Sequence, residues 1–163
     1  MTRVAACQIS LDIENPAQNI ARANKAINDA LSQGAQIIVL PELTNSGYAF
    51  TSVSEVQERS TTLDGEIIAT WKELAHKNDV VIVAGLALSV DSRLYNASVI
   101  IDKTGLLGWY AKVHLFGEEH QFFKAGEKPP LVVNTAHGRI ATMVCYDVEF
   151  PEWVRLAMLD RAV

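Results

Sequence analysis

The chain has 163 residues, of which 49% are apolar and 20% are charged, and its formal net charge is -5. This length is typical of one domain with a substantial core, so we expect a single domain over residues 1–163. Acidic and basic residues alternate without a basic block, which argues against nucleic acid or a membrane as a partner.

The first third of the chain predicts a strand, a helix and a second strand. Residues 3–9, RVAACQI, alternate between apolar and polar types and indicate a strand. Asn15-Pro16 begins a helix that continues to about Ser32, and Gly34 follows where a helix commonly ends. Residues 36–42, QIIVLPE, are almost wholly apolar, which is typical of a short strand covered on both faces.

The middle of the chain predicts a loop, a second helix and three strands. Residues 43–52 are polar and contain a glycine, so they indicate a loop. Residues 64–79 have helical periodicity, and residues 80–88 form an apolar run that suits a buried strand. Residues 93–102 and 106–112 are separated by a turn, which favours a hairpin.

The last third begins with an irregular segment, residues 113–130, for which we expect a long loop with one helical turn. Two strands follow, on either side of His137-Gly138, and Pro151 begins a third helix. Strands alternate with helices early and pair directly later. This order predicts a mixed, layered α/β protein.

Four ionisable residues follow apolar strands or lie in the loops after them: Glu42, Lys112, Glu119 and Cys145. Strand ends are where open α/β sheets assemble their sites, so these four side chains are candidates for one site. In that arrangement Cys145 is the nucleophile and Glu42 its base. Lys112 and the backbone N–H of Tyr146 stabilise an oxyanion, while Glu119 holds Lys112 or assists the second proton transfer.

The residue pattern alone leaves a second interpretation of Cys145 open, because free cysteine is among the most buried residue types. Cys7 lies inside an alternating strand and is expected in the core. His114 is expected to form structural hydrogen bonds within its loop. The three tryptophans are expected to pack in the core: Trp71, Trp109 and Trp153.

Cysteine and histidine usage argues against disulfides and metals. Two cysteines are too few for a disulfide framework, so we expect reduced thiols and a cytoplasmic protein. The N-terminus does not resemble a signal peptide, and no apolar run approaches the roughly 20 residues that span a bilayer. The histidines form no close Cys/His pairs, and no phosphate-binding glycine motif is present. We therefore expect neither a metal nor an organic cofactor.

Four motifs in order resemble the signatures of the nitrilase superfamily of carbon–nitrogen hydrolases. They are LPELTNSGY (40–48), YAKVHLF (110–116), EHQFFKAG (119–126) and VCYDVEFPE (144–152). The resemblance implies an αββα sandwich in which Glu42 is the general base, Lys112 stabilises the oxyanion and Cys145 is the nucleophile. Glu119 matches the family's additional structural or catalytic glutamate.

The implied reaction is hydrolysis of a small amide to acid and ammonia through a thioester on Cys145. Tyr48 and Tyr146 are expected to contact the substrate. Nitrilases of the family usually carry Cys-Trp-Glu at the nucleophile, whereas this chain has Cys145-Tyr146-Asp147. This difference favours an amide over an N-carbamoyl compound or a nitrile. The resemblance also implies a homodimer or larger oligomer.

Family members are longer, so we expect that the C-terminal portion of the sandwich is missing. The sequence is then incomplete, a deliberate fragment, or a true short product that is inactive or dependent on a partner. The isolated chain is expected to be weakly active or inactive. Two other functions remain open: a truncated paralogue that serves as an interaction module, and a redox sensor at Cys145.

Overall fold

The computed structural model describes residues 1–160. Seven strands, four α-helices and two short 3-10 helices follow one another along the chain. In order they are β1 (Val4–Ala6), α1 (Pro16–Ser32), β2 (Ile37–Val39), α2 (Val53–Arg59), α3 (Glu66–Asn78), β3 (Val81–Val90), β4 (Arg93–Asp102), β5 (Gly105–Ala111), the 3-10 helix Gly117–Gln121, β6 (Leu131–Thr135), β7 (Gly138–Thr142), the 3-10 helix Cys145–Glu149 and α4 (Pro151–Leu159).

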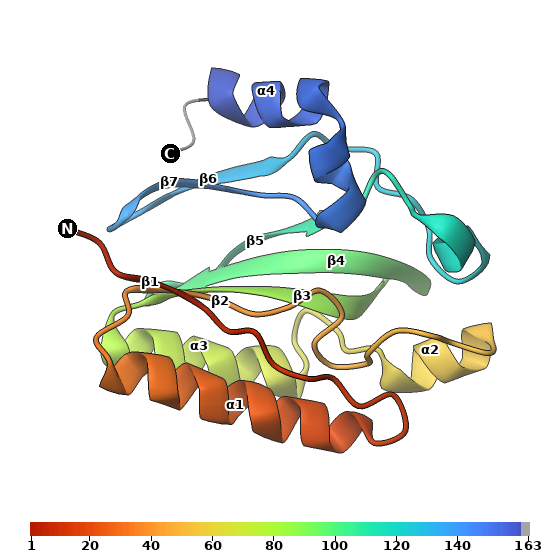
Figure 1. Ribbon diagram of the computed structural model, residues 1–163, viewed down its shortest axis with the longest axis horizontal. Helices are drawn as coiled ribbons and strands as arrows, with labels where there is room; N and C mark the ends of the chain where they lie inside the picture. The colour runs from red at the N-terminus through yellow and green to blue at the C-terminus, as the bar shows by residue number, and fades with distance from the viewer. Residues whose placement is uncertain (161–163) are drawn as a thin grey trace.

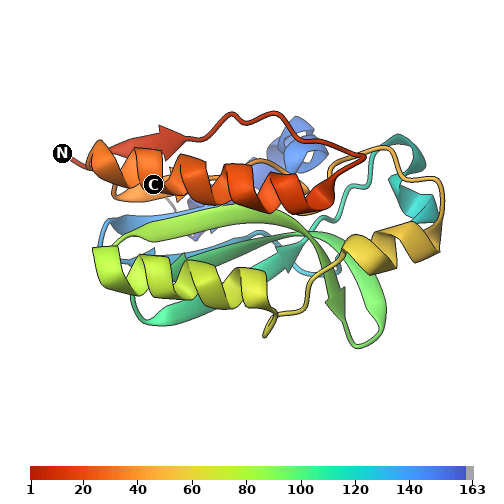
Figure 2. The same cartoon turned by 90° about the horizontal axis from the view of Figure 1, so that it is seen from below.

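These elements form four layers. Helices α1 and α3 lie on one face of a five-stranded sheet, the β6–β7 pair lies over the opposite face, and α4 lies beyond that pair (Figure 1). Seen from the helical side, α1 and α3 cross the sheet next to each other (Figure 2). The arrangement confirms the predicted layered α/β fold, with two sheets between helices.

The large sheet changes from parallel to antiparallel pairing along its width. Its strand order is β1-β2-β3-β4-β5, in which β1, β2 and β3 are parallel and β4 and β5 are antiparallel to their neighbours. The β3–β4 turn has positive φ at both Asp91 and Ser92, 49° and 61°, as the tight turns of β-hairpins require. The predicted hairpin of residues 93–102 and 106–112 is a different one, and the antiparallel pairing of β4 with β5 confirms it.

Apolar side chains fill the space on both sides of this sheet. Between the sheet and its helices, Ile27 of α1 and Trp71 of α3 are fully buried. The Trp71 indole donates to Asn24 Oδ1 at 2.8 Å, which satisfies its one polar group. Between the two sheets, Val81 and Ile100 pack against partly buried apolar residues of β6 and β7. The core therefore has two layers, one on each face of the large sheet. The candidate residues lie at or beyond the ends of strands of this sheet and of β7.

Three details differ from the expectations. The polar segment before residue 64 contains a helix, α2, whose Ser52 hydroxyl accepts from Glu55 N at 3.2 Å, and capping of this kind was not recognised in the sequence. Strand β2 is not covered on both faces, since Val39 is 37% exposed. The second sheet has two strands and is too narrow to cover this residue. Strand β7 ends at Thr142, three residues before Cys145.

Within residues 1–160, no helix combines the length and the apolar character that crossing a bilayer requires.

Candidate active site

Glu42 lies in a segment that runs close beside β3. Gly85 N donates to Pro41 O at 3.1 Å, and Thr44 N donates to Gly85 O at 2.9 Å. A Cβ at Gly85 would lie 2.4 Å from the Cα of Glu42, so only glycine permits this approach. The backbone of Glu42 is thus fixed on both sides by bonds to one strand.

Lys112 follows β5 and is fully buried, with Nζ 2.9 Å from Glu42 Oε1 and 2.9 Å from Glu119 Oε1. Glu119 is itself held at its other oxygen, because Phe116 N donates to Glu119 Oε2 at 3.0 Å. The backbone of Lys112 is fixed by Gly126 N, which donates to its carbonyl at 2.8 Å. Three of the four predicted site residues therefore form one ion-paired cluster.

The cluster favours the charged form of Lys112. Burial by itself disfavours the ammonium, but the hydrogen bonds and negative charges of Glu119 and Glu42 outweigh burial and raise the pKa of Lys112. A lysine ammonium has three N–H groups, and two of them are used on the glutamates. One N–H remains for another acceptor.

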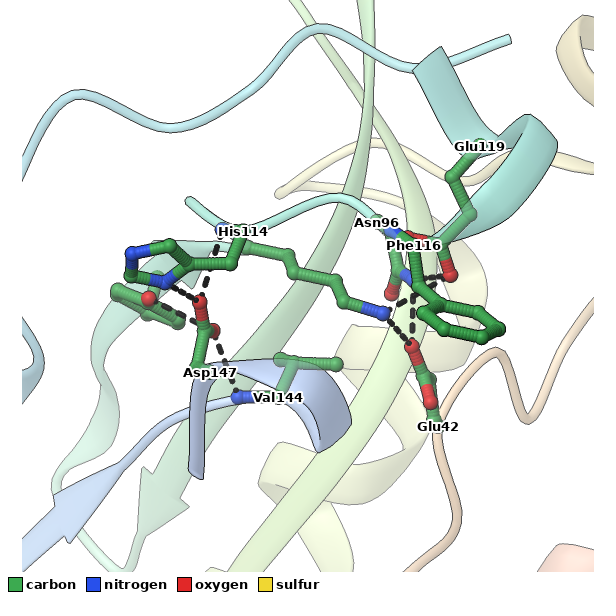
Figure 3. A network of polar contacts seen from close by, with 9 residues as sticks. Glu42, Asn96, His114, Phe116, Glu119, Val144 and Asp147 are labelled. Atoms are coloured by element: carbon green, nitrogen blue, oxygen red, sulfur yellow. Dashed lines mark hydrogen bonds and ion pairs between the residues drawn. The ribbon is translucent and has the colours of Figure 1, made fainter. Parts of the chain in front are cut away.

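Asn96 of β4 completes the cluster, and the sequence analysis did not single it out. Its Nδ2 lies 2.6 Å from Glu42 Oε1 and 3.2 Å from Glu119 Oε1, and the residue is fully buried. In Figure 3, Glu42, Asn96 and Glu119 converge on one point. The available signal was the one side-chain amide in the strand RLYNASVIID, between apolar neighbours.

Cys145 begins the 3-10 helix that follows β7, and its backbone φ is +46°. Few non-glycine residues adopt this left-handed conformation, and such strain is concentrated at functional sites. Cys145 is exposed, whereas Cys7 is half-buried and contacts the α1 side of the core. Cys7, expected in the core, packs against it but is only partly buried, whereas the exposure of Cys145 does not fit the alternative of a buried core thiol.

The thiol of Cys145 lies beside the glutamate cluster. Cys145 and Glu42 line the same small cavity, of about 120 Å³. Burial raises the pKa of Cys145, and the negative charge and polar contact of Glu42 raise it further, while the Lys112 ammonium opposes them. The resting thiol therefore holds its proton more firmly than a free cysteine does, and attack requires a base.

Asp147 fixes the turn that carries Cys145. Its fully buried carboxylate accepts from Val144 N at 3.1 Å, from the Tyr110 hydroxyl at 2.8 Å, and from both N and Nδ1 of His114. Figure 3 shows His114, Asp147 and Val144 joined in this way. His114 is structural as expected, but its partner is 33 residues away rather than within its own loop, because the loop folds back over the cysteine turn.

Tyr48 and Tyr146, the two residues expected to contact the substrate, both lie near the cluster: Tyr48 contacts Glu42, and Tyr146 directly follows Cys145. Burial, the polar contact with Glu42 and the nearby negative charges raise the pKa of Tyr48. The ring of Tyr146 contacts those of Phe116 and Phe150, with centroids 5.1 and 5.2 Å apart. Among residues 1–160, no backbone carbonyl accepts from the N–H of Tyr146. That N–H is therefore available to another acceptor.

A second cavity, of about 230 Å³, adjoins the cluster. Tyr48, Phe116 and Glu119 line it together with further apolar residues. In the described part of the chain, no group of three or more His, Cys, Asp or Glu side chains is arranged to hold a metal ion.

Comparison with known proteins identifies the family. The sequence model of the carbon-nitrogen hydrolase family, described as "Carbon-nitrogen hydrolase", matches residues 3–163. A curated relative named "Nitrilase" from Pyrococcus abyssi is 37% identical over 99% of this chain. A 2-oxoglutaramate amidase from Bacillus subtilis is 33% identical over 93% of it. The chain belongs to the carbon-nitrogen hydrolase family, that is, to the nitrilase superfamily.

Solved structures agree with this assignment. The crystal structure of an amidase from Nesterenkonia sp. superposes with a TM-score of 0.81 at 29% identity, over 99% of this chain and 62% of that one. Other structures of the same amidase have acrylamide, or the acetamide moiety of fluoroacetamide, bound covalently at the active-site cysteine. The present chain spans 62% of the Pyrococcus relative and 58% of the Bacillus relative.

Proposed function

We propose that the protein of which these residues form the site is a cysteine-dependent amidohydrolase that converts a small amide to an acid and ammonia. One observation carries the proposal. Glu42 contacts the buried Lys112 at 2.9 Å and shares a cavity with the accessible Cys145. A base, a cation and a nucleophile therefore meet in one place.

In the first step, the thiol of Cys145 transfers its proton to Glu42 as its sulfur attacks the amide carbon. Glu42 must act as a base because the pKa of Cys145 is raised. The remaining N–H of Lys112 and the free N–H of Tyr146 donate to the oxyanion that forms. Donors of this kind contribute about 3 to 4 kcal/mol each to transition-state stabilisation.

In the second step, Glu42 returns its proton to the departing nitrogen, the C–N bond breaks and ammonia leaves a thioester on Cys145. Glu42 then takes a proton from water, whose oxygen attacks the thioester carbon. Collapse of this second oxyanion releases the acid, and Glu42 returns the proton to the sulfur. Splitting hydrolysis in two replaces one difficult step with two easier ones.

Amides are the substrate class that we favour over nitriles and N-carbamoyl compounds. Several relatives carry amidase names, including omega-amidases from Arabidopsis thaliana and Escherichia coli. Others are named nitrilase or citrullinase, so the family's substrates vary. The Cys145-Tyr146-Asp147 sequence, together with the amidase adducts described above, supports the amide assignment.

Ammonia release from a panel of small aliphatic amides, nitriles and N-carbamoyl compounds tests the proposal. The chain, Cys145→Ala and Cys7→Ala are compared at equal concentration. The proposal expects release from amides that disappears in Cys145→Ala and persists in Cys7→Ala. If the chain by itself turns over too slowly, the matching cysteine substitutions are made in a full-length relative. Equal loss from both substitutions would indicate a folding defect instead of chemistry.

A further inference from the structure

A buried asparagine joins the two glutamates independently of Lys112. Asn96 Nδ2 lies 2.6 Å from Glu42 Oε1 and 3.2 Å from Glu119 Oε1, and Asn96 has an exposed fraction of 0%. A carboxylate oxygen only accepts hydrogen bonds, so the amide atom that faces both glutamates must be the nitrogen. Both protons of this amide are therefore used within the cluster.

The other end of the same amide has no partner. Asn96 Oδ1 is buried, and within residues 1–160 no donor reaches it. Buried acceptors without partners are rare in native proteins because they disfavour folding. An apolar side chain of similar volume would avoid this loss, so packing of β4 does not explain an amide at position 96.

We propose that Asn96 is a positioning residue that fixes which oxygen of Glu42 exchanges protons. This inference rests on the proposed function. Lys112 Nζ and Asn96 Nδ2 both donate to Glu42 Oε1, and within residues 1–160 no hydrogen bond of good geometry ends on Oε2. The Cys145 thiol and the Tyr48 hydroxyl make polar contacts with the same carboxylate. Oε1 is thus anchored by two donors, and Oε2 is left to take the thiol proton and later the proton of water.

The amide is suited to this task because it donates without adding charge. Glu42, Glu119 and Lys112 together carry a net charge of -1. A second cation at position 96 would balance that charge and weaken the base. An acid there would repel both glutamates. Asparagine orients Glu42 and leaves its charge in place.

The test measures how fast iodoacetamide alkylates Cys145 as a function of pH, which requires no turnover. A Cys7→Ser background makes Cys145 the only thiol. The charged and titratable groups that face this thiol are Glu42, Lys112, Glu119 and Tyr48. Asn96→Leu adds no charge but removes the two N–H dipoles that face Glu42 and Glu119, so the negative charge of Glu42 acts on the thiol with less opposition. The pH at which the alkylation rate reaches half its maximum, called the alkylation midpoint below, is therefore expected to move to higher pH. At pH values below the midpoint, the rate is expected to fall about threefold.

Two further variants at the same position keep the result decisive. Asn96→Ser retains one donor, and its alkylation midpoint is expected to lie between those of the parent and Asn96→Leu. This variant also tests the proposal if the leucine variant does not fold. Asn96→Asp adds a negative charge and is expected to give the largest shift to higher pH. A midpoint unchanged in both the folded serine variant and the aspartate variant overturns the proposal.

Asn19→Leu is the matched control. Asn19 is also fully buried, but its amide bonds only to the backbone of Asp12, far along the chain from the cluster. Its loss is expected to lower resistance to urea while the alkylation midpoint stays in place. A midpoint that moves equally in this control contradicts a specific role for Asn96. Amidase activity that survives in Cys145→Ala would instead refute the proposed function and leave the alkylation result unaffected.

Discussion

Asp147 and His114 are joined twice through a single atom. Asp147 Oδ1 accepts from His114 N at 2.9 Å and from His114 Nδ1 at 2.8 Å. Oδ2 of the same carboxylate accepts from Val144 N at 3.1 Å, directly before Cys145. The strained cysteine turn is therefore attached to the loop that follows β5, the same loop that carries Lys112 and Glu119.

Asp147→Asn is expected to destabilise the protein by about 3 kcal/mol, because an amide nitrogen would replace an acceptor that faces only donors. Urea unfolding measures the change. The control is Asp79→Asn at an exposed ion pair with Lys103, for which a change of about 0.5 kcal/mol or less is expected. A similarly small effect at Asp147 would show that this carboxylate does not hold the turn.

Lys112→Met is expected to lower the free energy of unfolding by about 3 to 5 kcal/mol, since it leaves the buried Glu119 and the largely buried Glu42 without their cation. Lys25→Met is the matched control, because Lys25 pairs with Asp29 on the exposed face of α1. That control is expected to change stability by about 0.5 kcal/mol or less. Equal changes in the free energy of unfolding for the two substitutions would show that the buried ion pairs of Lys112 contribute no more to stability than an exposed pair.

Glu42→Gln and Lys112→Met are expected to move the alkylation midpoint of Cys145 in opposite directions. The negative charge of Glu42 raises the pKa of Cys145, so its removal shifts the midpoint to lower pH. The Lys112 ammonium lowers that pKa, so its removal shifts the midpoint to higher pH. Rates of iodoacetamide modification in a Cys7→Ser background give both values. Shifts of the same sign would refute the electrostatic arrangement.

Gly85→Ala is expected to lower the free energy of unfolding by about 1 to 3 kcal/mol and to displace Glu42, because the new Cβ would lie 2.4 Å from the Glu42 Cα. Gly108→Ala on β5 is the control. The atoms nearest to its Cβ would belong to the Leu131 side chain, which can move. Urea unfolding and the Cys145 alkylation profile are compared for both variants. An unchanged alkylation profile in Gly85→Ala would show that this approach does not position Glu42.

The fold was predictable where local pattern and packing agree. Asn15-Pro16 located the start of α1, which runs from Pro16 to Ser32, and the turn at residues 103–105 separates the paired strands β4 and β5 as expected. The sequence did not reveal α2, because a seven-residue helix has too few turns to display a periodic stripe. Exposure of Val39 was also unpredictable, since it depends on the width of a second sheet.

The site was predictable to the level of its ionisable residues. Glu42, Lys112 and Cys145 follow apolar strands, and strand ends indicate where such groups meet. The neutral partner Asn96 was not predictable, since its role depends on a contact 54 positions away along the chain. The same holds for Asp147 and Tyr110, which meet only because the loops fold over each other.

Covalent capture tests most directly the claim that Cys145 is the nucleophile of this site. The chain is incubated with fluoroacetamide, digested and mapped by mass spectrometry, with Lys112→Met treated in parallel. We predict that the Cys145 sulfur displaces fluoride and carries one acetamide moiety, that Cys7 stays unmodified, and that Lys112→Met reacts more slowly. Equal modification of Cys7 and Cys145, or modification of Cys7 alone, would contradict it.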